Sequence, residues 1–149
     1  MSMKSKIGLK VIEYIKENYN YKPNPKKVYT IVGQTDLEYT IKDEEGNEKV
    51  VEYWEVLVLP KWELNEEERI ADYLNNNGVY GEVYKSGSEI TISIEWGDWK
   101  HDHILCGVLM GYIGYKEVGS EVVTEENGSD CYSADHYFQF FENVAIVAR

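Results

Sequence analysis

The segment from Glu89 to Trp96 alternates apolar and polar residues with a period of two. That period is typical of a strand with one face against a core and the other in water. A Ser-Gly-Ser turn at 86–88 joins it to a second strand-like segment, 79–84. The two segments predict an antiparallel hairpin, and a one-sided antiparallel sheet covered by helices is typical of the α+β class.

The spacing of apolar residues predicts three helices. They cover residues 6–19, 65–76 and 99–112. Asn65 and Glu68 have the spacing of a capping box at the start of the second helix, and Asp98 can cap the third. Pro23 and Pro25 exclude continuation of the first helix, because proline cannot donate a backbone hydrogen bond.

Three glycines share one helical face along and just beyond the third predicted helix, at Gly107, Gly111 and Gly114. Glycine in a helix interior costs about 1 kcal/mol relative to alanine. Close packing of this helix against another element would offset that cost, so the spacing predicts a tight contact at this face, with a ligand at the backbone as the alternative.

The order of predicted elements gives the fold. Helix, strand, strand occurs three times, beginning near residues 6, 65 and 99. Residues 50–124 follow the order β-α-β-β-α-β, which predicts a ferredoxin-like sheet with both helices on one face. A helix and a hairpin would precede this sheet. A hairpin with the turn Asn127-Gly128 and a short strand at 144–147 would follow it, all within a single 149-residue domain. The uncovered sheet face is then a candidate binding surface, although such a superfold does not choose a function.

The formal net charge of -12 is unevenly distributed along the chain. Residues 1–27 hold seven lysines and two acids, whereas residues 28–149 hold eight basic and 25 acidic groups. The sequence therefore predicts a basic N-terminal helix with a Pro-containing connector, followed by a strongly acidic body. Such a body disfavours direct nucleic-acid binding, because that affinity comes largely from Lys and Arg. It favours a basic protein partner, although an acidic surface also serves solubility alone.

Acids beside aromatic residues are the candidate partner-binding groups, since the chain has 13 Tyr and four Trp. The candidates are Asp43, Glu44, Glu45, Glu52, Glu55, Glu66, Glu67, Glu82, Glu125 and Glu126. Trp96 is expected in the core, and tyrosines such as Tyr84 are expected to be at least partly exposed. The alternative explanation of the tyrosines is that this residue is common in β-strands in general. The leading hypothesis is a non-enzymatic inhibitor or immunity-type protein that presents carboxylates where a nucleic-acid-binding partner would hold phosphates.

All three histidines and both cysteines lie within 36 positions. They are His101, His103, Cys106, Cys131 and His136. Imidazole and thiolate are zinc ligands, so this cluster is a candidate metal site. It is also the centre of the alternative hypothesis, which is a metal-dependent or His/Asp-based enzyme with a site around residues 101–136. The spacing partly opposes it, because His101 and His103 point about 200° apart on a helix and no C-x-x-C or H-E-x-x-H motif is present. Cys106 lies in an apolar stripe, where a buried thiol is expected.

The chain has no run of about 18 uncharged apolar residues and no signal-like apolar segment near its start. Two cysteines are too few to indicate an extracellular disulfide framework. We therefore expect a cytoplasmic protein with reduced thiols, without a membrane span, without a cofactor other than the zinc considered above, and monomeric or in a small homo-oligomer.

Overall fold

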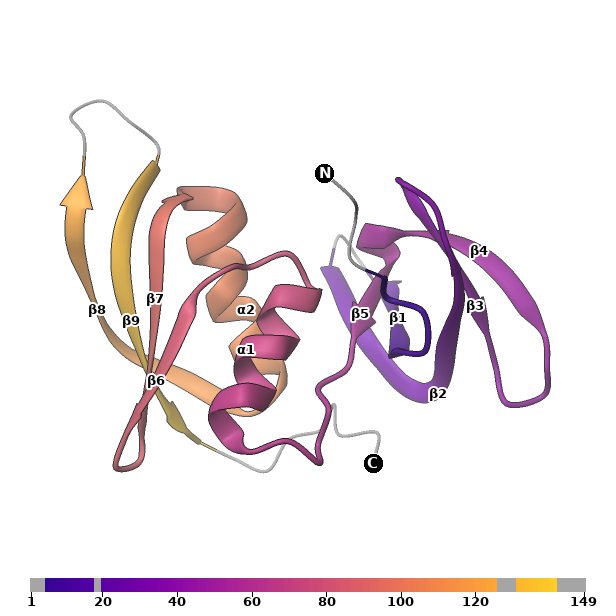
Figure 1. Cartoon of the computed structure of the whole chain (residues 1–149), viewed down its shortest axis with the longest axis horizontal. Coiled ribbons are helices and arrows are strands. Elements are labelled where there is room, and N and C mark those ends of the chain that lie inside the picture. The colour runs from indigo at the N-terminus through magenta and orange to yellow at the C-terminus, as the bar shows by residue number, and fades with distance from the viewer. Residues whose placement is uncertain (1–4, 18–19, 126–130, 142–149) are drawn as a thin grey trace. The chain divides into compact units, whose positions relative to one another are not determined.

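The computed structural model describes residues 5–17, 20–125 and 131–141. These residues form two antiparallel sheets, of five and four strands, with two α-helices (Figure 1). The chain divides into two compact units, the first within Met1–Leu59 and the second within Pro60–Ala145. The predicted α+β class is confirmed, with strands as the main component.

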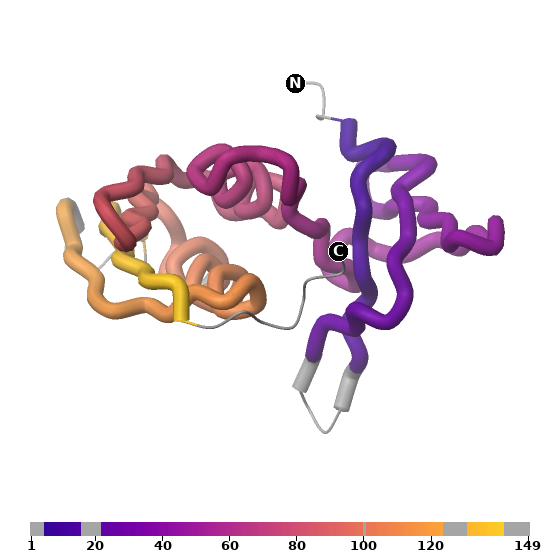
Figure 2. The backbone as a smooth tube through the Cα atoms, turned by 90° about the horizontal axis from the view of Figure 1, so that it is seen from below, coloured from indigo at the N-terminus to yellow at the C-terminus, as the bar shows by residue number. Residues whose placement is uncertain are grey.

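The first unit contains the five-stranded sheet, in the order β4-β3-β2-β1-β5. Its strands are β1 (Lys10–Glu17), β2 (Asn20–Gln34), β3 (Glu38–Lys42), β4 (Glu48–Glu52) and β5 (Val56–Val58). Strands β1 to β4 follow one another as a meander, and β1 runs beside the long β2 (Figure 2). A 3-10 turn, η1 (Tyr53–Glu55), then leads into β5, which pairs with the other edge of β1.

The helix predicted over residues 6–19 is wrong, because Lys10–Glu17 form the strand β1. Val11 and Ile12 are adjacent in sequence and both fully buried, as in a strand covered on both faces. The three- and four-residue spacing that suggested a helix arises here from β-branched residues that pair with β2 on one side and β5 on the other. The basic N-terminal segment is therefore part of a sheet.

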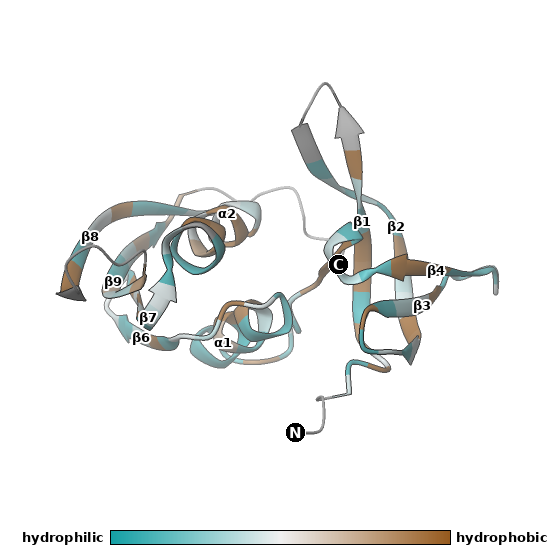
Figure 3. Ribbon diagram, turned by 90° about the horizontal axis from the view of Figure 1, so that it is seen from above, coloured by the Kyte–Doolittle hydropathy of each residue, from teal (hydrophilic) through white to brown (hydrophobic). Residues whose placement is uncertain are grey.

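The second unit contains two successive helix-hairpin modules. Its elements are α1 (Glu66–Asn76), β6 (Glu82–Ser86), β7 (Glu89–Asp98), the π-helical turn η2 (Trp99–Ile104), α2 (Leu105–Tyr112), β8 (Tyr115–Glu125) and β9 (Cys131–Phe140). The strand order is β6-β7-β9-β8, so the second strand of each hairpin lies at the centre. Both helices lie on the same side of this sheet, and α2 is largely hydrophobic (Figures 1 and 3).

The βαββαβ order predicted for residues 50–124 does not form one ferredoxin-like sheet. Strand β5 pairs with β1 in the first unit, while β6 to β9 form the second sheet by themselves. The sequence pattern identified most of the strands but carried no information about which sheet each one joins. The strand predicted at 144–147 and the turn at 127–128 lie outside the described residues.

The core of the second unit lies between its two helices and the inner face of the sheet. Asn65 caps α1 as predicted, since its side chain accepts a hydrogen bond from the Glu68 amide at 3.0 Å. The Tyr73 hydroxyl donates to the Leu109 carbonyl at 2.7 Å and joins α1 to α2. Fully or nearly fully buried apolar residues fill this core: Ile70, Tyr73, Leu74, Val79, Ile90, Ile92, Ile94, Cys106, Leu109, Met110 and Phe138.

The tight glycine contact predicted for the third helix is not present at Gly111. This residue is exposed on α2, and a Cβ built on it meets no atom within 4 Å. At Gly107 a Cβ would come no closer than 3.9 Å, to Glu117 Oε1. Gly114 instead ends the helix, with the positive φ of 96° that favours glycine. No helix in the described part of the chain is long and apolar enough to cross a membrane.

Candidate functional site

The outer face of the four-stranded sheet carries a group of carboxylates. Strand β7 turns Ile90, Ile92 and Ile94 into the core, so the residues between them lie on the opposite face. The register places Glu82 of β6 opposite Ser93 and Glu121 of β8 opposite Asp135 of β9 on that face. This surface, which we call the acidic face, is formed by Glu82, Tyr84, Glu89, Glu95, Glu121, Asp135 and Tyr137.

Two tyrosines of the acidic face each donate a hydrogen bond to one of its carboxylates. The Tyr84 hydroxyl donates to Glu82, and the Tyr137 hydroxyl donates to Glu121 Oε2 at 3.2 Å. The bond to Glu82 raises the pKa of Tyr84, with further contributions from Asp135 and Glu95. Partial burial and then Glu121 raise the pKa of Tyr137, with Asp135 also contributing. The pKa of each phenol is therefore raised by carboxylates from two or more strands, because these carboxylates lie close together.

The carboxylates of the acidic face have no cationic partner among the residues that the structure describes. None of the five acids takes part in an ion pair there. Lys85 of β6 points to the other side of the sheet and pairs with Glu66 of α1 at 2.8 Å. Lys116 of β8 lies with its ammonium 5.1 Å from the centre of the Phe141 ring. Within the described side chains, the negative charge of this face thus has no ion-pair partner.

A bulge in β7 presents an aromatic residue beside the acidic face. The register of β7 with β9 shifts between Ile94 and Gly97, so Glu95 and Trp96 form the bulge. Trp96 has a φ of 50°, is 51% exposed, and its amide donates to Ser133 Oγ at 2.9 Å. The expectation that Trp96 lies in the core is wrong, because the inserted residue interrupts the alternation on which that expectation rested.

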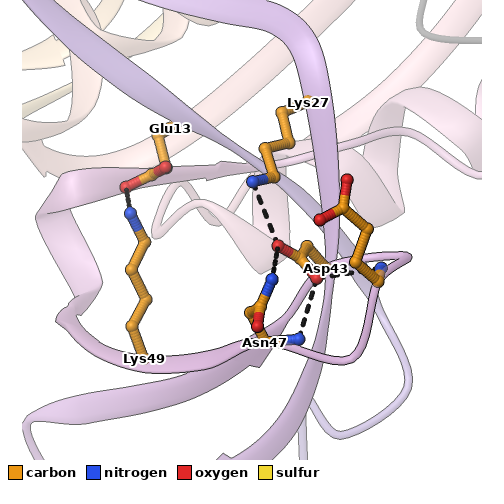
Figure 4. A network of polar contacts seen from close by, with 6 residues as sticks. Glu13, Lys27, Asp43, Asn47 and Lys49 are labelled. Atoms are coloured by element: carbon orange, nitrogen blue, oxygen red, sulfur yellow. Dashed lines mark hydrogen bonds and ion pairs between the residues drawn. The ribbon is translucent and has the colours of Figure 1, made fainter.

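The predicted candidate Asp43 lies in the first unit and has a structural role. Its side chain is 3% exposed, pairs with Lys27 at 3.0 Å and accepts from the Asn47 amide at 2.9 Å (Figure 4). The bond to Lys27, followed by that to Asn47, lowers its pKa from 3.8 to about 2. In the same network Lys49 pairs with Glu13 at 2.6 Å. These contacts close the β3-β4 hairpin and hold it against β2 and β1.

The other predicted acids occupy different surroundings. Glu52 precedes η1 and Glu55 is its last residue. Glu55 accepts from the Glu52 amide at 2.8 Å, and Glu52 accepts from the Trp54 indole. Glu66 pairs with Lys85 and accepts from the Tyr115 hydroxyl. Glu44, Glu45 and Glu67 are exposed. Glu82 belongs to the acidic face, and Glu125 lies at the end of β8. Glu126 lies outside the described residues.

The structure brings together two of the five predicted metal ligands. His103 Nδ1 lies 2.8 Å from His136 Nε2, and the two residues are 4% and 6% exposed. His101 is exposed, and Cys106 is buried in α2, where burial and then Glu117 raise its pKa to about 12. Cys131 begins β9 opposite Asp98. Among the described residues, no three His, Cys, Asp or Glu side chains form a group that could hold a metal ion, and the zinc hypothesis stays a prediction.

The turn that carries His103 begins with the predicted cap. Asp98 Oδ1 accepts from the His101 amide at 3.0 Å, and Asp102 Oδ2 accepts from the Asp98 amide at 2.7 Å. The first turn is π-helical and becomes regular α-helix only at Leu105. This irregular turn places His103 toward β9 while His101 remains exposed.

Sequence analysis missed Glu89, Glu121 and Asp135 as members of one surface. Glu89 and Asp135 alternate with buried residues along their strands, so the period of two was the available signal for these two, whereas the residues around Glu121 on β8 are all exposed. Their meeting depends on the strand order, which periodicity does not give. Comparisons of the chain with protein-family models, curated proteins and solved structures found no match.

Proposed function

We propose that this is a non-enzymatic binding protein that engages a basic protein partner through the acidic face. The observation that carries the proposal is the convergence of Glu82, Glu89, Glu95, Glu121 and Asp135 on one exposed sheet face without an ion pair in the described residues. Unpaired charges of one sign attract an oppositely charged surface and steer its approach.

The charge of the two units supports the same proposal. Residues 60–145 contain 17 acidic and five basic groups, a formal charge of -12, whereas residues 1–59 contain ten acidic and nine basic groups. The acidic face thus belongs to the unit that holds almost all of the net negative charge. A partner attracted to this unit would be rich in Lys and Arg.

Charge mimicry is the specific form of binding that we propose. The five carboxylates of the acidic face come from four neighbouring strands, β6 to β9, and neighbouring strands are about 5 Å apart. Such a surface presents several negative charges at short intervals, as a nucleic-acid backbone does. The protein would occupy the basic groove of a nucleic-acid-binding partner and thereby inhibit it, as an immunity-type protein does.

Binding to a Lys/Arg-rich peptide tests this proposal. A variant with E82Q, E95Q, E121Q and D135N removes four charges from the acidic face. The control variant E44Q, E45Q, E63Q and E67Q removes four exposed charges elsewhere. We expect the first variant to bind a decamer of arginine at least about tenfold more weakly at low salt, and the control to lose much less. Equal losses in the two variants would contradict the proposal, because they would show attraction to net charge only.

The alternative enzyme hypothesis has one contact in its favour, that between His103 and His136. Both rings are more than nine-tenths buried, and each ring nitrogen of His103 already faces a polar atom. A general base must reach the proton that it abstracts from a substrate. The buried pair does not offer that access, and we therefore favour the binding function.

A further inference from the structure

The two tyrosines of the acidic face lie in one row across the four strands. The register places Tyr84 of β6 and Tyr137 of β9 on either side of Thr91 of β7. Directly opposite residues of antiparallel strands share a face, so the two tyrosine backbones are about 10 Å apart with only a short side chain between them. On the far side of Tyr137, β8 contributes Gly119, and a Cβ there would lie 3.7 Å from Tyr137 Cδ2.

Carboxylates form a second row beside the tyrosine row. The members of this row, opposite one another on β6, β7, β9 and β8, are Glu82, Ser93, Asp135 and Glu121. On β6 and on β9 the tyrosine and the carboxylate of the two rows are two residues apart, which is about 7 Å along a strand. The Tyr84 hydroxyl donates to Glu82 and the Tyr137 hydroxyl to Glu121, so each ring has a carboxylate bonded to its hydroxyl.

The first unit contains an occupied example of the same combination. Burial and then a hydrogen bond to Glu13 on β1 raise the pKa of Tyr29 on β2. Lys49 on β4 pairs with this glutamate at 2.6 Å (Figure 4), and its ammonium lies 5.3 Å from the centre of the Tyr29 ring. Lys27 lies 5.6 Å from the centre of the same ring. In this chain a tyrosine bonded to a glutamate thus holds cations by its ring as well as by the carboxylate.

On the acidic face the same combination has no cation of its own. Among residues 5–17, 20–125 and 131–141, no lysine or arginine lies over the ring of Tyr84 or Tyr137. Tyr84 is 52% exposed, so a cation from outside can reach its ring. A planar guanidinium can stack on such a ring and donate two hydrogen bonds to a carboxylate, whereas the ammonium of lysine has no plane to stack. The two rows therefore favour arginine over lysine.

We propose that Tyr84 and Tyr137 form two arginine subsites on the acidic face, in each of which a guanidinium stacks on the tyrosine ring and pairs with the neighbouring carboxylates. The subsites rest on the proposed function and deepen it, because they name arginine side chains as the groups of the basic partner that this face selects. The carboxylates attract any cation, and the rings supply the preference among cations. A fitting partner presents at least two arginines in one exposed segment.

Binding of a decamer of arginine and a decamer of lysine at low salt, measured by calorimetry, tests the subsites. The wild-type chain should bind the arginine decamer at least about fivefold more tightly than the lysine decamer. In the double variant Tyr84→Leu, Tyr137→Leu this ratio should fall below about twofold, mainly through weaker binding of the arginine decamer. The double variant Tyr84→Phe, Tyr137→Phe keeps both rings and should keep the preference. Tyr80→Leu alters a tyrosine that is 70% exposed and precedes β6, and should behave as wild type.

The outcomes distinguish failure of the subsites from failure of the proposed function. An unchanged preference for arginine in the leucine variant, or equal binding of the two decamers by the wild type, would overturn the subsites. The proposed function would stand in that case if the variant E82Q, E95Q, E121Q and D135N still lost affinity for both decamers. If that charge variant bound both decamers as the wild type does, the subsites and the proposed function would fail together.

Intermolecular NOEs of the isotope-labelled wild-type chain with the unlabelled arginine decamer give a second test that does not depend on a variant folding. We expect NOEs from the ring protons of Tyr84 and Tyr137 to the Cδ protons of arginine, which lie next to the guanidinium. Amide shifts on the acidic face without NOEs to either ring would overturn the subsites, because the peptide would then be held by the carboxylates alone.

Discussion

The sheet of the first unit and the acidic face of the second differ in how their charged residues are paired. In the first unit, lysines pair with carboxylates between strands, as Lys27 does with Asp43 and Lys49 with Glu13. In the second unit, the carboxylates of the acidic face have no ion pair in the described residues. Ion-paired charges connect strands of the fold, whereas unpaired like charges on one face attract an oppositely charged surface, which is the basis of the binding function that we propose. The bulge at Trp96 and the π-helical turn η2 lie in the second unit, although the first sheet also contains two register shifts.

The largest effect is expected for Gly97→Ala at the junction of β7 and η2. A Cβ at this position would lie 2.5 Å from Ile94 Cγ2 and 2.8 Å from Asp102 Cβ, so the bulge or the turn must shift. Overpacking of this kind costs about 1–3 kcal/mol. Denaturant unfolding followed by Trp fluorescence would measure the loss. An unchanged midpoint would show that the irregular segment is loosely packed.

The same substitution in each unit tests whether the charges differ in role. Asp43→Asn removes the partner of Lys27 and should destabilise the first unit at pH 7, whereas Asp135→Asn removes an uncompensated charge and should not destabilise the second. Because the pKa of Asp43 is lowered to about 2, its contribution is present above about pH 4 and lost as the pH falls toward 2.

Thermal unfolding at pH 7 and pH 2 would follow both variants. The difference between Asp43→Asn and the wild type should disappear at the lower pH. A destabilised Asp135→Asn, or a Asp43→Asn variant as stable as the wild type at pH 7, would remove the contrast between the units.

A smaller effect of the opposite sign is expected for Gly111→Ala on α2. The added methyl group meets no atom within 4 Å, and alanine has a higher helix propensity than glycine. We expect a gain of about 0.5–1 kcal/mol in the free energy of unfolding of the second unit. A loss of stability would instead support the close packing that the glycine spacing suggested.

Local features of the fold could be predicted from the sequence, but their assembly could not. The caps at Asn65 and Asp98 and the strand around Ile92 were predictable, because each depends on residues only a few positions apart. Strand β1 was mistaken for a helix, since its β-branched residues also fit helical spacing and only pairing with β2 and β5 decides between the two.

The candidate site shows the same division between local and long-range information. The sequence indicated acids beside tyrosines and included Glu82, but the meeting of Glu121 with Asp135 depends on β8 pairing with β9. Asp43 was chosen for its charge, whereas its partner Lys27 is 16 positions away and lies on another strand. His103 and His136 were in one predicted cluster, but their direct contact required the irregular turn η2.

The most direct test of the binding function is an NMR titration of the ¹⁵N-labelled chain with the arginine decamer. The account predicts that chemical-shift changes are largest for amides of β6, β7, β8 and β9 around Tyr84, Glu95 and Tyr137, and that moderate salt reverses them. Changes centred on the first unit, or distributed evenly over the acids of both units, would contradict the acidic face as the binding surface.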